Sequence, residues 1–196
     1  MITILDYGMG NLRSVEKALE SLGAASKVSE SLDGCEKLII PGVGAFGAAM
    51  ERLAPMRDDI RGFASSGQPL LGICLGQQLL FERSEELGEF EGLGLIPGDV
   101  CYLPRDVGLK VPHVGWSPLH YRRCEGLADD AVEGEQVYFV HSLHTVCEEP
   151  GDVLATATYG VEFAAAVSRG NVWGAQFHPE KSSSVGLRML RRFVAC

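Results

Sequence analysis

The sequence is short of positive charge. Lys and Arg together number 17 against 26 Asp and Glu, which gives a formal net charge of −9. The densest basic run, at Arg188, Arg191 and Arg192, has the spacing of a solvated helix face. Because nucleic-acid binding needs a basic stripe that follows the phosphates, we expect no nucleic-acid partner.

Paired cysteines and long apolar runs are also missing. The six cysteines lie far apart and form no CxxC pair, so neither a disulfide scaffold nor a zinc site is expected. No apolar run approaches the ~18 residues that span a bilayer, and the first residues do not resemble a signal peptide. These absences predict a cytoplasmic protein with no membrane partner and no metal.

The chain does have the composition of a compact enzyme domain. Apolar residues make up 46% of its 196 residues and charged residues 22%, and 24 residues are glycine. A chain of this length buries roughly 70% of the surface that its unfolded form exposes. Since no internal repeat, low-complexity tract or linker interrupts it, residues 1–196 are expected to form a single domain.

Apolar runs and helical patterns alternate in the first half of the chain. Strands are expected at 2–5, 37–40 and 69–73, and the helices that follow them at 12–22, 45–53 and 75–81. This alternation predicts an α/β fold with a mostly parallel central sheet covered by helices.

The second half has shorter strands separated by turn residues. They are expected at 137–140, 153–158, 163–167 and 172–177, before a final helix at 184–194. Such strands are typical of antiparallel additions, so the sheet is predicted to carry an antiparallel C-terminal extension.

A candidate nucleophile lies where the third apolar strand meets its helix. Gly72-Ile73-Cys74-Leu75-Gly76 has the G-x-[SC]-x-G pattern of a nucleophile elbow. A helix N-terminus favours the thiolate of Cys74, and the amide of Leu75 would face the oxyanion on an attacked carbonyl. The alternative is a buried cysteine on a glycine-rich strand end, with which this short pattern alone is compatible.

A histidine and a carboxylate near the C-terminus supply the rest of a triad. His178 and Glu180 flank Pro179, and residues two apart in an extended segment point the same way. Cys74 is therefore expected to be the nucleophile, His178 the base and then the acid, and Glu180 the group that orients the imidazole. This chemistry needs no cofactor. The remaining histidines are expected to be structural or to lie beside a ligand: His113, His120, His141 and His144.

A glycine-rich turn follows the second apolar strand. Gly42, Val43 and Gly44 come after Pro41, at the edge where open α/β sheets place their ligands. Their backbone amides would complete an oxyanion hole. The alternative is a tight turn that uses glycine only for its positive φ.

Together these segments resemble the class I (triad) glutamine amidotransferases, whose pattern is P-G-x-G, then G-x-C-x-G, then H-P-E. More narrowly, five segments are similar to the glutaminase subunits of imidazole glycerol phosphate synthases, and the similarity runs nearly end to end. The segments are Asp6-Tyr7-Gly8-Met9-Gly10-Asn11-Leu12, Pro41-Gly42-Val43-Gly44, Cys74-Leu75-Gly76, Tyr138-Phe139-Val140-His141-Ser142 and Phe177-His178-Pro179-Glu180-Lys181-Ser182.

The resemblance implies a flavodoxin-like glutaminase that takes glutamine as substrate and forms a heterodimer with a (βα)8-barrel cyclase. The barrel would use the ammonia to make imidazole glycerol phosphate and an aminoimidazole carboxamide ribotide in histidine biosynthesis. By the same resemblance, Val43 and Leu75 supply oxyanion amides. It also places Gln78, His141 and Ser142 near glutamine, and Asn11, Trp116 and Lys181 at the partner interface.

Two positions depart from the family pattern. Ser117 follows Trp116 where the family usually has Asn, and Leu143 follows Ser142 where it usually has an aromatic residue. These departures leave open a paralogous glutaminase that feeds a surface-sugar amidotransferase. A catalytically silent assembly subunit and a related cysteine peptidase or chaperone-like protein are further alternatives. The complete triad argues against the silent subunit, and the glycine-rich turn beside the triad argues against the peptidase.

Overall fold

The structure is a computed structural model that describes residues 1–104, 108–128 and 130–196. Its central sheet contains a parallel part made by five strands: β1 (Ile2–Leu5), β2 (Ser26–Ser29), β3 (Lys37–Gly42), β4 (Leu70–Cys74) and β14 (Val172–Ala175). They lie in the order β2-β1-β3-β4-β14, and every neighbouring pair is parallel. This is the strand order of flavodoxin-like folds.

The carboxyl ends of three of these strands meet at one edge of the sheet. Gly42 at the end of β3 lies opposite Cys74 at the end of β4, and Ala175 at the end of β14 lies opposite Ile73. The glycine-rich turn, the cysteine and the segment before His178 are thereby brought together, although more than a hundred residues separate the first from the last.

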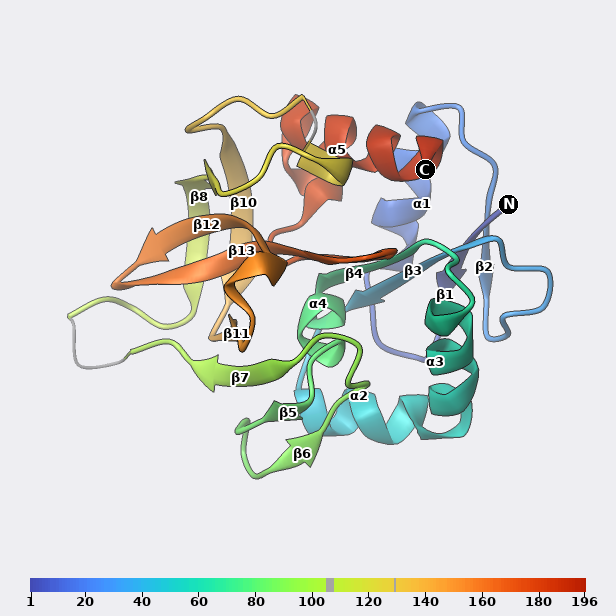
Figure 1. The fold of residues 1–196 in the computed structure, drawn as a ribbon, viewed down its shortest axis with the longest axis horizontal. Helices are drawn as coiled ribbons and strands as arrows, with labels where there is room; N and C mark the ends of the chain where they lie inside the picture. Colours follow the sequence, from blue (N-terminus) through green and yellow to red (C-terminus); the bar gives the residue numbers. More distant parts are fainter. Residues whose placement is uncertain (105–107, 129) are drawn as a thin grey trace.

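Helices cover both faces of the sheet and close two apolar cores (Figure 1). One face is covered by α1 (Leu12–Ser21) and α5 (Ser183–Ala195), and the other by α2 (Phe46–Leu53), α3 (Arg57–Ser65) and α4 (Leu75–Leu79). Along β3, Leu38 and Ile40 enter one core while Ile39 enters the other. This alternation explains why the strand is apolar at successive positions.

The sheet continues beyond β14 through antiparallel strands. They are β13 (Val161–Arg169), β12 (Val153–Tyr159), β11 (Leu143–Cys147) and β7 (Gly98–Tyr102). A separate two-stranded sheet pairs β8 (His113–Pro118) with β10 (Gln136–His141). The remaining elements are the short strands β5 (Arg83–Ser84), β6 (Phe90–Glu91) and β9 (His120–Tyr121) and 3-10 turns at Ala54–Met56, Gly126–Ala128, Pro150–Asp152 and Pro179–Lys181.

The predicted fold class is confirmed, with one correction to its second half. The strand expected at 172–177 ends at Ala175 and is parallel to β4, so only its pairing with β13 is antiparallel. Helix α4 is also shorter than expected and ends at Leu79. In the described part of the chain, no helix is long and apolar enough to cross a membrane.

Helix α4 packs against the sheet with no room for a side chain at its second residue. A Cβ built on Gly76 would lie 1.8 Å from the carbonyl oxygen of Ile40, and one built on Gly72 would lie 2.4 Å from the oxygen of Gly76. Both glycines of the nucleophile pattern are therefore required by contact between backbones.

We expect Gly76→Ala to lower the free energy of unfolding by about 3 kcal/mol or more, since the new methyl group meets fixed backbone. Gly62→Ala is the matched control, because Gly62 lies in α3 and a Cβ added there would have nothing within 4 Å. This control should raise stability by about 0.5–1 kcal/mol. Chemical denaturation measures both, and equal stabilities for the two variants would rule out the close packing.

Candidate active site

Cys74 occupies a strained backbone conformation between β4 and α4. Its φ is 57° and its ψ is −112°, in a region that L-residues rarely adopt. Such a conformation costs about 1–3 kcal/mol and persists only where the surrounding structure imposes it. The backbone contacts of Gly72 and Gly76 on either side impose it here. The thiol is consequently held at the carboxyl edge of the sheet, at the start of a helix.

His178 and Glu180 form a buried pair. The Nδ1 of His178 lies 2.8 Å from Oε1 of Glu180, and their side chains are 2% and 1% exposed. The expectation of an extended segment is wrong for Glu180, because Pro179 begins a 3-10 turn and only His178 is extended. The turn still brings the carboxylate to Nδ1, so Nε2 remains directed away from it.

Strand β10 fixes the backbone of His178. The amide of His178 donates to the carbonyl oxygen of Tyr138 at 3.0 Å. The Ser182 hydroxyl donates to the carbonyl of His178 at 2.6 Å and accepts the amide of Tyr138 at 3.0 Å. The backbone that carries the imidazole is therefore fixed to the two-stranded sheet.

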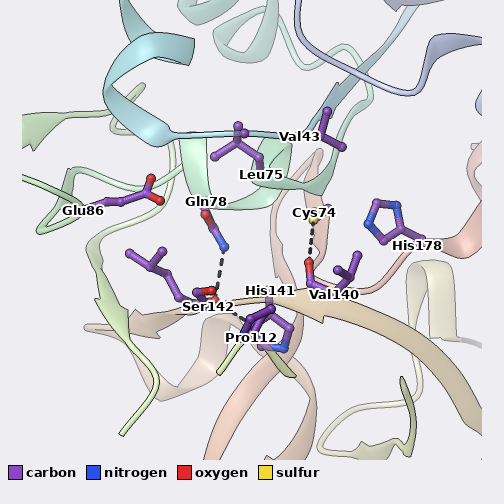
Figure 2. Close-up of a pocket in the computed structure, with 12 residues that line it drawn as sticks. Val43, Cys74, Leu75, Gln78, Glu86, Pro112, Val140, His141, Ser142 and His178 are labelled. Carbon is purple, nitrogen blue, oxygen red and sulfur yellow. Dashed lines mark hydrogen bonds between the residues drawn. The ribbon is translucent and has the colours of Figure 1, made fainter. Parts of the chain in front are cut away.

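Cys74 and His178 face the same cavity without a hydrogen bond between them (Figure 2). The Sγ of Cys74 lies 3.9 Å from the carbonyl oxygen of Val140 and 3.9 Å from Nε2 of Gln176. Nε2 of His178 has no hydrogen-bond partner among the described residues. Catalytic hydrogen bonds are often long or poorly aligned until the substrate is bound, so this geometry is compatible with a nucleophile and its base.

The surroundings of His178 favour its protonated form. Burial alone would lower the pKa of His178, but Cys74 and the Glu180 carboxylate outweigh burial and raise it to about 9. A positively charged imidazole in turn stabilises negative charge on a neighbouring sulfur. The pair is thus arranged as a nucleophile beside a proton donor.

The cavity has a volume of about 300 Å³, at the small end of the range for ligand pockets. Eight residues predicted from the sequence line it: Val43, Gly44, Cys74, Leu75, Gln78, His141, Ser142 and His178. Gly42 and Glu180 lie behind this lining, Gly42 beside Cys74 and Glu180 beside His178. The described residues contain no cluster of three or more His, Cys, Asp or Glu side chains that could hold a metal ion.

A tyrosine hydroxyl binds the end of β3, just before the glycine-rich turn. Pro41 and Gly42 are the last residues of β3, so the turn itself begins at Val43, whose side chain is 44% exposed. The Tyr7 hydroxyl donates to the carbonyl oxygen of Pro41 at 2.9 Å, and burial raises the pKa of Tyr7. Gly44 has a φ of 107°, so this position does require the freedom of glycine.

Glu86 is a cavity residue that the sequence did not indicate. Its Oε2 accepts the amide of Phe46, the first residue of α2, at 2.5 Å, and its carboxylate borders the cavity. Glu86 belongs to an acidic stretch with Glu82, Glu85 and Glu89, which is typical of a solvated surface. Only the fold reveals that one of these carboxylates borders the cavity that Cys74 also lines.

The residues expected at a partner interface lie outside the cavity lining. Trp116 is 50% exposed on β8, and the Lys181 side chain is exposed in the 3-10 turn after His178. Asn11 is half-buried before α1, where its Oδ1 accepts the Ser14 hydroxyl at 2.9 Å. All three remain predictions as interface residues.

Comparison with known proteins places this site in a family. Residues 3–196 match the family described as glutamine amidotransferase class-I. The chain belongs to the class I glutamine amidotransferases.

Curated relatives of this amidotransferase share about half of its residues. It is 48% identical over 203 residues to the imidazole glycerol phosphate synthase subunit HisH of Syntrophotalea carbinolica, with 98% of each chain covered. It is 51% identical to the HisH subunit of Desulfitobacterium hafniense, covering 98% of this chain and 93% of the relative. A solved chain of PurLQS from Thermotoga maritima has a TM-score of 0.77 at 21% identity, covering 99% of this amidotransferase and 97% of that chain, which shows a shared fold.

The His178–Glu180 pair predicts a pH-dependent stability. A histidine whose pKa rises from 6.5 to about 9 on folding adds stability that is fully present below pH 6.5 and is lost as the pH rises through 9. Glu180→Gln removes the carboxylate charge and leaves the contribution of Cys74, so the pKa of His178 should fall part of the way from about 9 toward its ordinary value. We expect the free energy of unfolding of the wild type to exceed that of Glu180→Gln most at and below pH 6.5, and the difference to shrink toward pH 9.

Denaturant unfolding across this pH range measures the difference. Glu51→Gln, which neutralises an exposed carboxylate on α2, is the control and should show no such trend. A difference between wild type and Glu180→Gln that stays constant or grows with pH would contradict the assigned pairing.

Proposed function

We propose that residues 1–196 form a single glutaminase domain, the glutamine-hydrolysing subunit of an imidazole glycerol phosphate synthase. The names of relatives that are 48–51% identical over 98% of the chain support this function most directly. The domain would release ammonia and pass it to a (βα)8-barrel cyclase. That partner would make imidazole glycerol phosphate and an aminoimidazole carboxamide ribotide in histidine biosynthesis.

Cys74 and His178 carry out the hydrolysis in two steps in this proposal. The thiolate of Cys74 attacks the side-chain amide carbon of glutamine, and the oxyanion faces the amides of Val43 and Leu75. The imidazolium of His178 gives its Nε2 proton to the leaving nitrogen, so ammonia departs and a glutamyl thioester remains. Nε2 then takes a proton from water, which attacks the thioester and releases glutamate and the Cys74 thiolate.

The cavity offers separate groups for the two ends of glutamine. Cys74 and His178 lie on one side, and the Glu86 carboxylate borders the other (Figure 2). A carboxylate is a suitable partner for the α-ammonium group of the substrate. The Gln78 side chain lies between them and is 5% exposed. Its amide would contact the part of glutamine that does not react.

Cys74→Ala should abolish glutamine hydrolysis, with a fall of at least about 1000-fold, because no other group can form the thioester. The unfolding midpoint should change little, since the thiol borders the cavity and its two contacts, with Val140 and Gln176, are both as long as 3.9 Å. Cys124→Ala, at an exposed cysteine, is the control. Residual turnover of more than a few per cent in Cys74→Ala would contradict the proposed nucleophile.

An exposed apolar face beside the cavity supports the partner assignment. Val114 and Trp116 on β8 pair with Val140 and Tyr138 on β10, and Val114, Trp116 and Val140 are 56%, 50% and 36% exposed. Val43, at the cavity, adds a further exposed apolar side chain. Because Val140 also lines the cavity, a partner bound on this face would lie over its mouth. Ammonia could then pass between the two proteins without entering bulk water.

Turnover with and without a barrel cyclase from the same genome tests the partner. We expect low activity of the chain alone and strong stimulation by the cyclase with its nucleotide ligand, since an uncoupled glutaminase would waste glutamine. Trp116→Ala should weaken the affinity for the cyclase at least about tenfold, as expected for an exposed aromatic anchor. Val28→Ala, at an exposed valine on the edge strand β2, is the control.

Two outcomes of this experiment would contradict the partner assignment. The first is full activity of the isolated chain, and the second is stimulation only by some other acceptor synthetase. The second outcome would leave the glutaminase proposal intact and overturn the assignment to histidine biosynthesis.

A further inference from the structure

A chain of buried hydrogen bonds runs from β8 to the cavity. Oγ of Ser117 lies 3.0 Å from Nε2 of His113, and Nδ1 of His113 lies 3.0 Å from Nε2 of His141. Nδ1 of His141 lies 2.7 Å from the carbonyl oxygen of Leu143. All four residues are buried, so water does not compete for these bonds. Their exposed fractions are 9% for Ser117, 2% for His113, 5% for His141 and 4% for Leu143.

The carbonyl at the end of this series of hydrogen bonds determines which atom of each pair carries the hydrogen. The Leu143 oxygen can only accept, so Nδ1 of His141 must carry a hydrogen. In a neutral imidazole Nε2 is then an acceptor, and His113 must donate to it from Nδ1. By the same reasoning Nε2 of His113 accepts, and the Ser117 hydroxyl must donate.

Both histidines are held neutral by their surroundings. Burial lowers the pKa of His113, and burial is the main cause that lowers the pKa of His141 to about 3. Aromatic rings enclose the pair: Tyr159 stacks on His113 with 4.1 Å between ring centroids, and Phe163 lies 4.9 Å from His141. The assignment of donors and acceptors given above requires both imidazole rings to be neutral.

The last acceptor in this series of hydrogen bonds, the Leu143 carbonyl oxygen, also orients Gln78. The Leu143 oxygen also accepts from Nε2 of Gln78 at 3.3 Å, and the same Nε2 donates to Oε1 of Gln176 at 2.9 Å. Both hydrogens of the Gln78 amide are therefore directed at protein acceptors. Its Oε1 is the atom left to meet a ligand in the cavity that Gln78, His141 and Leu143 line together.

We propose that Ser117, His113 and His141 are positioning residues that hold the Leu143 carbonyl, and through it the Gln78 amide, in the geometry that binds glutamine. This inference rests on the proposed glutaminase function. It gives a role to Ser117, which lies one residue from the exposed Trp116, and to two histidines outside the triad. It also predicts that Asn is acceptable at position 117, because its side-chain N–H can donate to His113 as the serine hydroxyl does.

The position of the protons is directly measurable. Long-range ¹H–¹⁵N NMR spectra of the histidine-labelled chain at neutral pH should show His113 and His141 with hydrogen on Nδ1, assigned with His113→Gln and His141→Gln. Packing alone would not impose this tautomer on both rings. An Nε2–H tautomer or an imidazolium at either residue would overturn the proposal.

Kinetics of the complex with the cyclase test the effect on glutamine. Ser117→Ala leaves the buried Nε2 of His113 without a donor, and we expect KM for glutamine to rise about 3-fold to 30-fold while kcat changes less. Ser117→Asn should stay within about threefold of the wild type, because it keeps a donor. Ser168→Ala removes a buried hydroxyl at the far end of the β13–β14 pairing and should leave KM unchanged.

An unchanged KM in Ser117→Ala, or an equal loss in Ser117→Asn, would overturn the proposal. If Ser117→Ala fails to fold, the tautomers of the wild type and the KM of Ser117→Asn still decide it. A wild-type complex that does not hydrolyse glutamine would instead remove the proposed function, while the NMR result would still report whether the hydrogen-bond chain exists.

Discussion

The contact between helix α4 and strand β3 is the constraint on which the site depends. The backbone of Gly76 lies against the carbonyl of Ile40 so closely that no methyl group fits between them. The chain passes from β4 into this position at Cys74, where φ is 57°. The strain at the cysteine is thus a consequence of close packing between a helix and a sheet, and the same packing places the thiol at a helix start.

The parallel sheet determines where the other segments of the site lie. Since β3, β4 and β14 run in the same direction, the segments that follow them meet at one edge. The chain reaches β14 only after making the antiparallel strands, and it leaves β14 toward His178. The two-stranded sheet then fixes His178 through Tyr138 and Ser182 and offers Val140 to the cavity. Backbone and side-chain hydrogen bonds therefore hold together a site that is made from distant segments.

Sequence reasoning succeeded where one local pattern determined the structure. The apolar runs of β1, β3 and β4 and the glycines around Cys74 belong to such patterns, and both follow from backbone packing. It missed β2, whose sequence Ser-Lys-Val-Ser is polar because it is an edge strand. It also missed α3 and the strands β7, β8 and β11.

The finer contacts of the site depend on tertiary structure that no spacing encodes. The approach of Glu86 to the cavity is set by its bond to the start of α2, forty residues earlier in the chain. The 3-10 turn that carries Glu180 differs from the extended segment that the motif suggested, although both bring the carboxylate to His178. The proton order between His113 and His141 appears only when β8 and β10 are paired.

The proposed chemistry requires that the strained Cys74 attack glutamine and carry the glutamyl group. The most direct test is to mix the active complex with glutamine, quench it in acid during turnover and map the modified peptides by mass spectrometry. We predict a glutamyl thioester on the peptide that contains Cys74, and none on peptides that contain the other five cysteines. Continued hydrolysis with no adduct on Cys74, or an adduct on another cysteine, would contradict the proposed nucleophile.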